Sequence, residues 1–138
     1  MDQDRNVRQI VNPPGSEFTY DTYHFAQANR VGDLIWVSGQ VGVDADMAPA
    51  AGMAAQARLA FQSLGDVLEA AGAELRDVVE LTTFHIDLHS EMEAFMAVKD
   101  EFFPDRFPAW TAVGTPQLAL PGLLVEVRAT AVAGSGRT

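Results

Sequence analysis

The stretch from residue 123 to residue 133 alternates between two kinds of side chain, and no other feature constrains the fold more. One set of alternate positions is apolar: Leu123, Val125, Val127, Ala129 and Ala131. The positions between them are mixed: Leu124, Glu126, Arg128 and Thr130. Because successive side chains of a strand point to opposite faces of the sheet, this pattern predicts a strand with one face in the core. The mixed face must then be solvated or covered by another subunit.

Two stretches repeat their apolar residues at three- and four-residue steps, which predicts two amphipathic helices. The first begins at Met53, and Gly72 stands where a C-terminal cap is expected. The second has Ser90 as its expected N-cap, with Glu93 completing a capping box, and ends at Pro104. Its expected core residues are Met92, Phe95, Met96, Phe102 and Phe103.

Further stretches are rich in β-branched and aromatic residues and predict strands at residues 6–11, 33–38, 78–87 and 109–114. The glycines of residues 39–42 indicate a bulge or a close backbone approach after the second strand. Residues 16–29 lack a clear period and predict an ordered loop. The fold class is therefore α+β, with two helices on one face of the sheet. An oligomer that covers the other face is expected.

The 138 residues predict a single domain, with an N-terminal strand and loop over residues 1–19 and a flexible tail over residues 134–138. The net charge of −10 argues against a nucleic-acid partner, and against a ribonuclease, because such proteins need a basic surface. No apolar run approaches the length of a membrane span, and the first residues do not resemble a signal peptide. The absence of cysteine fits a cytoplasmic location and excludes thiolate chemistry.

Few residues offer cofactor or metal chemistry, so no cofactor and no metal are expected. His85 and His89 are four apart, but one is expected in a strand and the other in the following turn, without an H-E-x-x-H pattern. Ser38 lacks the G-x-S-x-G setting of a serine hydrolase. Lys99, the only lysine, is expected on an exposed helix face, which disfavours lysine Schiff-base chemistry.

Several segments, in the same order, resemble one family. Residues 32–40 are similar to its G-x-x-[ILV]-[FWY]-x-S-G-Q signature, and residues 23–28 to its G-P-Y-x-Q-A segment. Residues 70–79 resemble its A-G-x-x-x-x-D-V-V pattern. Residues 107–109 and 124–127 resemble its P-A-R-[ST] and [LV]-[VI]-E-[IV] strands. The chain is thereby identified as a member of the YjgF/YER057c/UK114 (Rid, reactive intermediate deaminase) superfamily.

The resemblance implies a chorismate-mutase-like α+β fold and a homotrimer with a central barrel. It also implies a small-molecule ligand in a cleft between subunits, and hydrolysis of enamine or imine intermediates to a ketoacid and ammonia. In that family a glutamate positions the attacking water, which corresponds to Glu126. The pocket residues correspond to Phe25, Ser38 and Gly39, with Ala112 on the neighbouring rim. Trp110 stands where the family has the arginine that grips the substrate carboxylate, as in the arginine-lacking subfamilies.

Each of these residues also has a structural interpretation. Glu126 could serve as the acid/base for adding water to a C=N bond, or form an ion pair with Arg128. Trp110 could stack on a flat or apolar ligand, or close the pocket as packing. Arg128 could anchor an anion in place of the missing arginine. Two functions therefore remain open: an imine hydrolase with an unusual substrate preference, and a non-catalytic ligand-binding or regulatory trimer.

Overall fold

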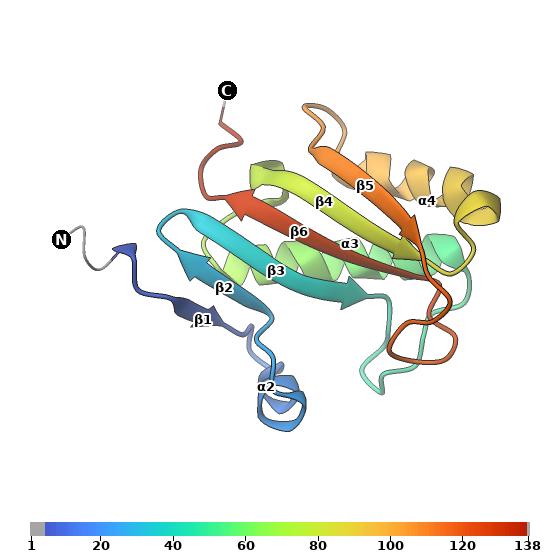
Figure 1. Cartoon of the computed structure of the whole chain (residues 1–138), viewed down its shortest axis with the longest axis horizontal. Coiled ribbons are helices and arrows are strands. Elements are labelled where there is room, and N and C mark those ends of the chain that lie inside the picture. The colour runs from blue at the N-terminus through green and yellow to red at the C-terminus, as the bar shows by residue number, and fades with distance from the viewer. Residues whose placement is uncertain (1–4, 138) are drawn as a thin grey trace.

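A computed structural model describes residues 5–137, which form one six-stranded mixed sheet with helices on one face (Figure 1). The strand order is β1-β2-β3-β6-β4-β5. The strands are β1 (Gln9–Val11), β2 (Ala28–Val31), β3 (Leu34–Val41), β4 (Val78–His85), β5 (Ala109–Gly114) and β6 (Val125–Val132). β4 and β5 are parallel, and the other neighbouring pairs are antiparallel. The predicted α+β class is confirmed.

Two long helices, α3 (Met53–Ala70) and α4 (Leu88–Phe102), lie behind the sheet in Figure 1 and leave its front face open. α3 packs against β3 and β6, while α4 connects the parallel strands β4 and β5. A short helix α2 (Glu17–Tyr23) lies beyond one end of the sheet, and a 3-10 turn η1 (Leu75–Asp77) precedes β4. The arrangement agrees with the prediction that two helices cover one face.

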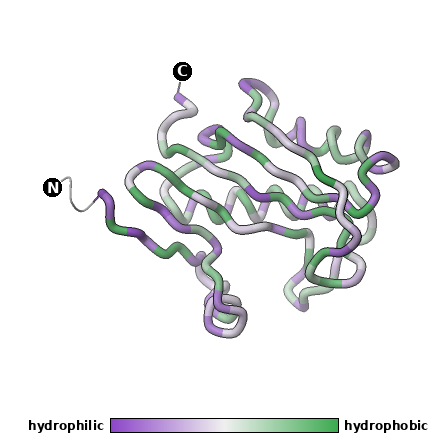
Figure 2. Tube along the Cα trace, in the orientation of Figure 1, coloured by the Kyte–Doolittle hydropathy of each residue, from purple (hydrophilic) through white to green (hydrophobic). Residues whose placement is uncertain are grey.

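The core lies between the sheet and the two long helices. The predicted inner face of the last strand is confirmed, because Leu123, Val125, Val127, Ala129 and Ala131 are all buried. Phe61 of α3 packs with its ring centroid 5.6 Å from Phe95 and 5.7 Å from Phe103. Figure 2 shows polar and apolar residues alternating along the strands and helices. Each buried aromatic ring of this kind contributes about 1.5–3 kcal/mol of hydrophobic stabilisation.

Residues 16–29 were predicted to form an ordered loop, and this prediction was wrong. They contain helix α2, which buries none of its residues and therefore lacks the apolar repeat that marks a helix in a sequence. They also begin strand β2, in which Ala28 pairs with Val37 of β3. A strand of four residues is too short to display a clear alternation.

The predicted start of the second helix was also wrong. α4 begins at Leu88, with Asp87 in the N-cap position, and no side chain makes a capping hydrogen bond there. Lys99 was expected to be exposed but is only 5% exposed. Its ammonium lies 4.6 Å from the centre of the Trp110 ring, so an aromatic surface takes the place of water. Met96, expected in the core, is instead 41% exposed.

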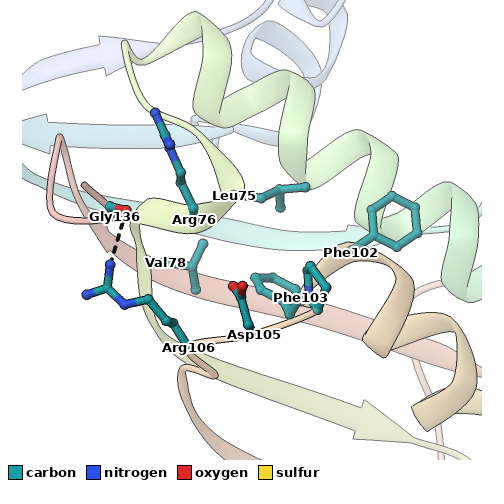
Figure 3. A pocket seen from close by; sticks show the side chains of 9 residues that line it. Leu75, Arg76, Val78, Phe102, Phe103, Asp105, Arg106 and Gly136 are labelled. Atoms are coloured by element: carbon teal, nitrogen blue, oxygen red, sulfur yellow. Dashed lines mark hydrogen bonds between the residues drawn. The ribbon is translucent and has the colours of Figure 1, made fainter. Parts of the chain in front are cut away.

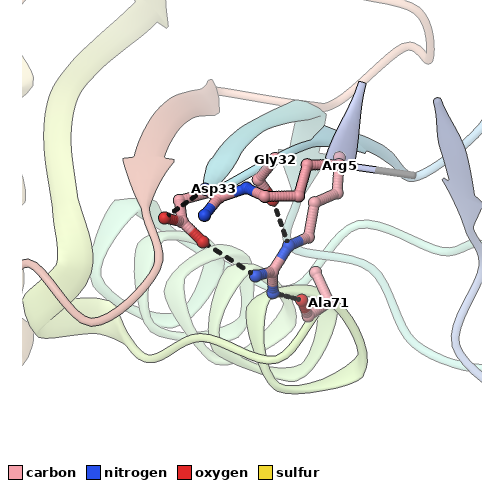
Figure 4. A network of polar contacts seen from close by, with 5 residues as sticks. Arg5, Gly32, Asp33 and Ala71 are labelled. Atoms are coloured by element: carbon pink, nitrogen blue, oxygen red, sulfur yellow. Dashed lines mark hydrogen bonds and ion pairs between the residues drawn. The ribbon is translucent and has the colours of Figure 1, made fainter. Parts of the chain in front are cut away.

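Arg30 ties the β2–β3 turn to the end of α3. Figure 4 labels its partners Gly32, Asp33 and Ala71. The Nε of Arg30 donates to the carbonyl of Gly32 at 2.8 Å, and its Nη1 donates to the carbonyl of Ala71 at 2.7 Å. Asp33 accepts from Arg30 at 3.3 Å and from Arg5 at 2.8 Å. A cation at a helix C-terminus satisfies carbonyls that have no partner within the helix, and this arginine does so at Ala71, just beyond the end of α3.

Candidate functional site

Glu126 lies on the open face of the sheet, opposite Val41 of β3 and Phe84 of β4. The register of β3 shifts between Val37 and Gln40, which confirms the predicted irregularity after the second strand. Gly39 lies within that shift, and the Glu126 carboxylate packs against it. A Cβ atom built on Gly39 would overlap Oε2 of Glu126. The bulge and the missing side chain together create the space that the carboxylate occupies.

The environment of Glu126 favours the protonated form of its side chain. Burial raises the pKa of the Glu126 carboxyl above its ordinary value, because a half-buried carboxylate is less well solvated. Within residues 5–137, no hydrogen bond or ion pair holds this carboxylate, and Arg128 does not pair with it. Arg128 is exposed on the same open face. The ion pair considered from the sequence is therefore not formed in this part of the chain.

Ser38 anchors the segment that carries Phe25. Its hydroxyl donates to the carbonyl of Ala26 at 2.7 Å, and its backbone N–H donates to the carbonyl of Gln27 at 2.8 Å. Phe25 follows the left-handed residue His24 that ends α2, and it is 42% exposed. Ser38 thus acts on the position of Phe25 through the backbone, while the Phe25 ring remains available for contact.

Phe25 and Gly39 line one cleft of about 370 Å³. Its walls come from the loop before α2, the end of β3 and the middle of α3. The polar side chains along it include Gln27, Gln40, Ser63 and Asp66. The structure therefore brings Phe25 and Gly39 together in a concave site, whereas Glu126 contacts Gly39 from the open face and does not line the cleft.

Trp110 lies on the other face of the sheet, toward α4. It pairs in register with the buried residue Leu81, and its Nε1 donates to the Thr83 hydroxyl at 2.9 Å. Its ring centre is 6.1 Å from that of Phe95. Ala112, two residues further along β5, pairs with Thr83. Within one chain, Trp110 thus serves as packing, and it does not share a face with Glu126.

Sequence reasoning missed the buried polar pair behind Trp110. The Thr83 hydroxyl lies 2.7 Å from Nε2 of His85, and both side chains are fully buried. Burial lowers the pKa of the His85 imidazole, and its Nδ1 has no hydrogen-bond partner among residues 5–137. His89 is exposed on α4, so the two histidines do not meet. No group of three or more potential metal-ligating side chains occurs in the described residues.

A further cavity, of about 340 Å³, lies between the start of β4 and the end of α4 (Figure 3). Apolar side chains such as Val78 and Phe103 line it, with Asp105 and Arg106 at its edge. It contains none of the site residues predicted from the sequence. Across the described part of the chain, no helix is long and apolar enough to cross a membrane.

Comparison with known proteins supports one family. The model of the family described as Endoribonuclease L-PSP matches residues 19–133. The RutC family protein YjgH of Escherichia coli is 42% identical over 113 residues, covering 81% of this chain and 86% of the relative. A human protein named 2-iminobutanoate/2-iminopropanoate deaminase is 31% identical over 133 residues, covering 94% of this chain and 91% of its own length.

Solved structures agree with this assignment. The structure of protein YJGH has a TM-score of 0.83 at 39% identity and covers 91% of this chain and 96% of its own. Rv2704 of Mycobacterium tuberculosis, described as a member of the YjgF/YER057c/UK114 family, has a TM-score of 0.79 at 32% identity. That match covers 92% of this chain and all of the other. The chain therefore belongs to the Endoribonuclease L-PSP family, which is the YjgF/YER057c/UK114 or Rid family.

Proposed function

We propose that this protein hydrolyses imines, with Glu126 as the general acid/base. The observation that carries the proposal is the environment of the Glu126 carboxylate. This group is half-buried, has no hydrogen-bond or ion-pair partner within residues 5–137, and has a pKa above its ordinary value. A general base works best when its pKa lies near the working pH, and burial moves a carboxyl in that direction. Relatives named as 2-iminobutanoate/2-iminopropanoate deaminases support the same class of reaction.

The reaction adds water to a C=N bond. The Glu126 carboxylate takes a proton from water as the water oxygen bonds to the imine carbon. The same proton then passes to the nitrogen. As the C–N bond breaks and ammonia leaves, the carboxylate takes the proton of the added hydroxyl group, which gives the carbonyl compound. Ammonia then takes that proton from the carboxyl and becomes ammonium. A protonated imine R₂C=NH₂⁺ and one water thus give R₂C=O and NH₄⁺. One carboxyl group can serve all of these proton transfers because each transfer from it restores the carboxylate.

The proposed substrates differ from small α-imino acids. An arginine can clamp a carboxylate through two parallel hydrogen bonds, and an indole cannot. The single N–H of Trp110 already donates to Thr83, so it has no further proton to offer a substrate. The proposal also includes the intersubunit cleft, the homotrimer and the cytoplasmic location expected from the sequence.

Ammonia release from a panel of imines tests this proposal. We expect cyclic and aromatic imines without an α-carboxylate to be hydrolysed faster than 2-iminobutanoate. Glu126→Gln should lower the rate at least about 100-fold, which is the usual contribution of general acid–base catalysis. Glu80→Gln is the matched control, because Glu80 is exposed on the same open face and its loss should leave the rate unchanged. Equal rates for the parent and Glu126→Gln would refute the proposal.

The rate should also depend on pH in a defined direction. Because burial raises the pKa of Glu126, the base form should be lost on acidification at a higher pH than for an ordinary glutamate. The acidic limb of kcat/KM should therefore lie above about pH 4.3, the unperturbed value. A limb at or below that value would show that Glu126 is not the titrating base.

A second candidate function is a non-catalytic trimer that binds a ligand. The observation that favours it is Trp110, which occupies the anchor position and is committed to packing against Phe95 and Thr83. A thermal-shift screen separates the two functions. Stabilisation by small molecules without ammonia release from any imine supports the binding protein, whereas ammonia release supports the hydrolase.

A further inference from the structure

We infer that the cleft between α3 and the bulge of β3 selects small apolar cations, and that Asp66 sets this charge preference. The inference deepens the proposed function. It rests on that function for the identity of the ligand, since a protonated imine is such a cation. The charge preference does not depend on the proposed function, because it follows from the side chains that line the cleft.

The charge of the cleft comes from one residue. Among the described residues that line the cleft, Asp66 carries the charge, and none of the others is a lysine or an arginine. Within residues 5–137, neither a hydrogen bond nor an ion pair engages the Asp66 carboxylate. A cleft that carries charge of one sign attracts ions of the other sign and repels those of its own.

Glu126 lies near the cleft, on the open face of the sheet, but it is not among the residues that line it. Its side chain packs against Gly39, and Gly39 itself lines the cleft. The positive charge nearest along the strand, Arg128, is exposed and is not among the lining residues. A carboxylate-bearing ligand would therefore enter a cleft in which the Asp66 carboxylate repels it.

The apolar residues that line the cleft favour a ligand that is apolar as well as positively charged. Phe25 is 42% exposed and Met47 is 54% exposed, and both line the cleft with Val41 and Val43. An aromatic face attracts cations as well as apolar groups, and a methionine adapts its shape to a bound ring. The cleft volume of about 370 Å³ fits a small ring system.

Three polar side chains on one wall of the cleft, Gln27, Gln40 and Ser63, already hydrogen-bond to one another. The Gln40 amide nitrogen donates to Gln27 Oε1 at 2.9 Å and to the Ser38 carbonyl at 3.1 Å. The Ser63 hydroxyl donates to Gln40 Oε1. The hydrogen of Ser63 is thus used internally, and its oxygen can still accept a hydrogen bond from the N–H of a ligand. This wall therefore suits a ligand that donates hydrogen bonds.

Three probes of matched size test the inference: benzylammonium, benzyl alcohol and benzoate. Their dissociation constants would be measured by NMR titration at low ionic strength. We expect benzylammonium to bind more tightly than benzyl alcohol, and benzoate to bind most weakly. Asp66→Asn should weaken the binding of benzylammonium about threefold to fivefold, which is the effect of one solvent-screened charge pair. It should leave the binding of benzyl alcohol unchanged. Added salt should weaken benzylammonium in the parent and have less effect in the variant.

Glu69→Gln is the matched control, because Glu69 lies one turn further along α3, is exposed and does not line the cleft. It removes one negative charge and should leave all three dissociation constants unchanged. Benzoate binding as tightly as benzylammonium, or an unchanged preference in Asp66→Asn, would overturn the inference.

The binding titrations need no turnover, so they separate the two proposals. Charge selectivity that depends on Asp66, without hydrolysis of any imine, supports the cation site and overturns the hydrolase. Hydrolysis that depends on Glu126, without charge selectivity in the cleft, overturns the cation site alone.

Discussion

The indole Nε1 of Trp110 donates a hydrogen bond of 2.9 Å to the Thr83 hydroxyl, from one strand to the next across the helix-covered face of the sheet. Because the Thr83 oxygen accepts this proton, its own hydrogen can be donated to Nε2 of His85, 2.7 Å away. Trp110, which the sequence predicts at the family's anchor position, is thereby linked to the buried core. Its replacement should change stability as well as ligand preference.

Replacing Trp110 with phenylalanine should destabilise the protein by about 1–3 kcal/mol. The change removes one hydrogen bond, worth about 1 kcal/mol, and weakens the contact of the ring with the Lys99 ammonium. Urea denaturation would measure the loss. Tyr23→Phe is the control, because it also removes one polar group from an aromatic ring, but at a side chain that is 64% exposed. Similar losses in the two variants would mean that the hydrogen bond to Thr83 contributes nothing.

The buried imidazole of His85 should make the protein less stable in mild acid. Burial lowers the pKa of His85, so the folded state resists protonation while the unfolded state binds a proton near its ordinary value of about 6.5. Stability should therefore fall as the pH falls from about 7.5 to about 5, by at most about 1.4 kcal/mol per pH unit. Denaturation midpoints measured across this range would show the slope.

His85→Gln should flatten this slope, whatever its effect on stability at neutral pH. His89→Gln is the control, because it removes an exposed imidazole from α4. Its profile should follow that of the parent. If His85→Gln kept the full loss of stability on acidification, groups other than His85 would be responsible for it.

The fold could be predicted from the sequence wherever one face of an element is buried. β6 and α3 show clear periods because Val125, Val127, Phe61 and Leu64 all point into one core. α2 could not be predicted, because nothing in it is buried. Lys99 was misplaced for a related reason: a pattern of residue types does not reveal that two aromatic rings cover a charged group.

The members of the candidate site remain predictions from the sequence, whereas their arrangement comes from the structure. Family resemblance pointed to Glu126, Gly39 and Phe25, and the bulge in β3 brings the first two into contact. The direction of Trp110 depends on the pairing of β5 with β4, a contact between segments far apart in the chain. Because a shift of one residue in that pairing would reverse the face, the sequence alone could not decide it.

Deleting residues 134–138 should destabilise the protein by about 1–3 kcal/mol, although these residues were predicted to form a flexible tail. The Gly136 N–H donates to the buried Asp77 carboxylate at 2.8 Å, and the Ser135 hydroxyl donates to the Asp77 carbonyl at 3.3 Å. Removing one hydrogen-bond partner of a buried charged group costs more free energy of unfolding than removing a partner of a neutral group. Thermal or urea denaturation would measure the loss, and deletion of residues 137–138 is the control, since it keeps the Gly136 N–H.

The effect of this deletion should also depend on pH. Burial acts to raise the pKa of Asp77, but backbone N–H groups, those of Gly136 and Glu74 above all, together with the charge of Arg76, lower it by more, and the net shift is downward. A carboxyl with a lowered pKa stabilises the fold above its ordinary pKa of about 3.9, and this contribution is lost as the pH falls further. The difference between parent and deletion variant should therefore shrink below about pH 4. A constant difference would indicate that the tail acts through other contacts.

The contact between Gly39 and Glu126 can be measured by a double-mutant cycle. Gly39→Ala should cost about 1–3 kcal/mol of unfolding free energy, because the added methyl group overlaps the Glu126 carboxylate. The backbone at Gly39 does not require a glycine, since its φ is not in the left-handed region, so the cost should come from this overlap. In the Glu126→Ala background the space is empty, and the same substitution should cost at least about 1 kcal/mol less. Equal costs in the two backgrounds would show that the glycine serves the strand and not the carboxylate. Ammonia release by Gly39→Ala alone should fall as well, because the added methyl group displaces the proposed acid/base.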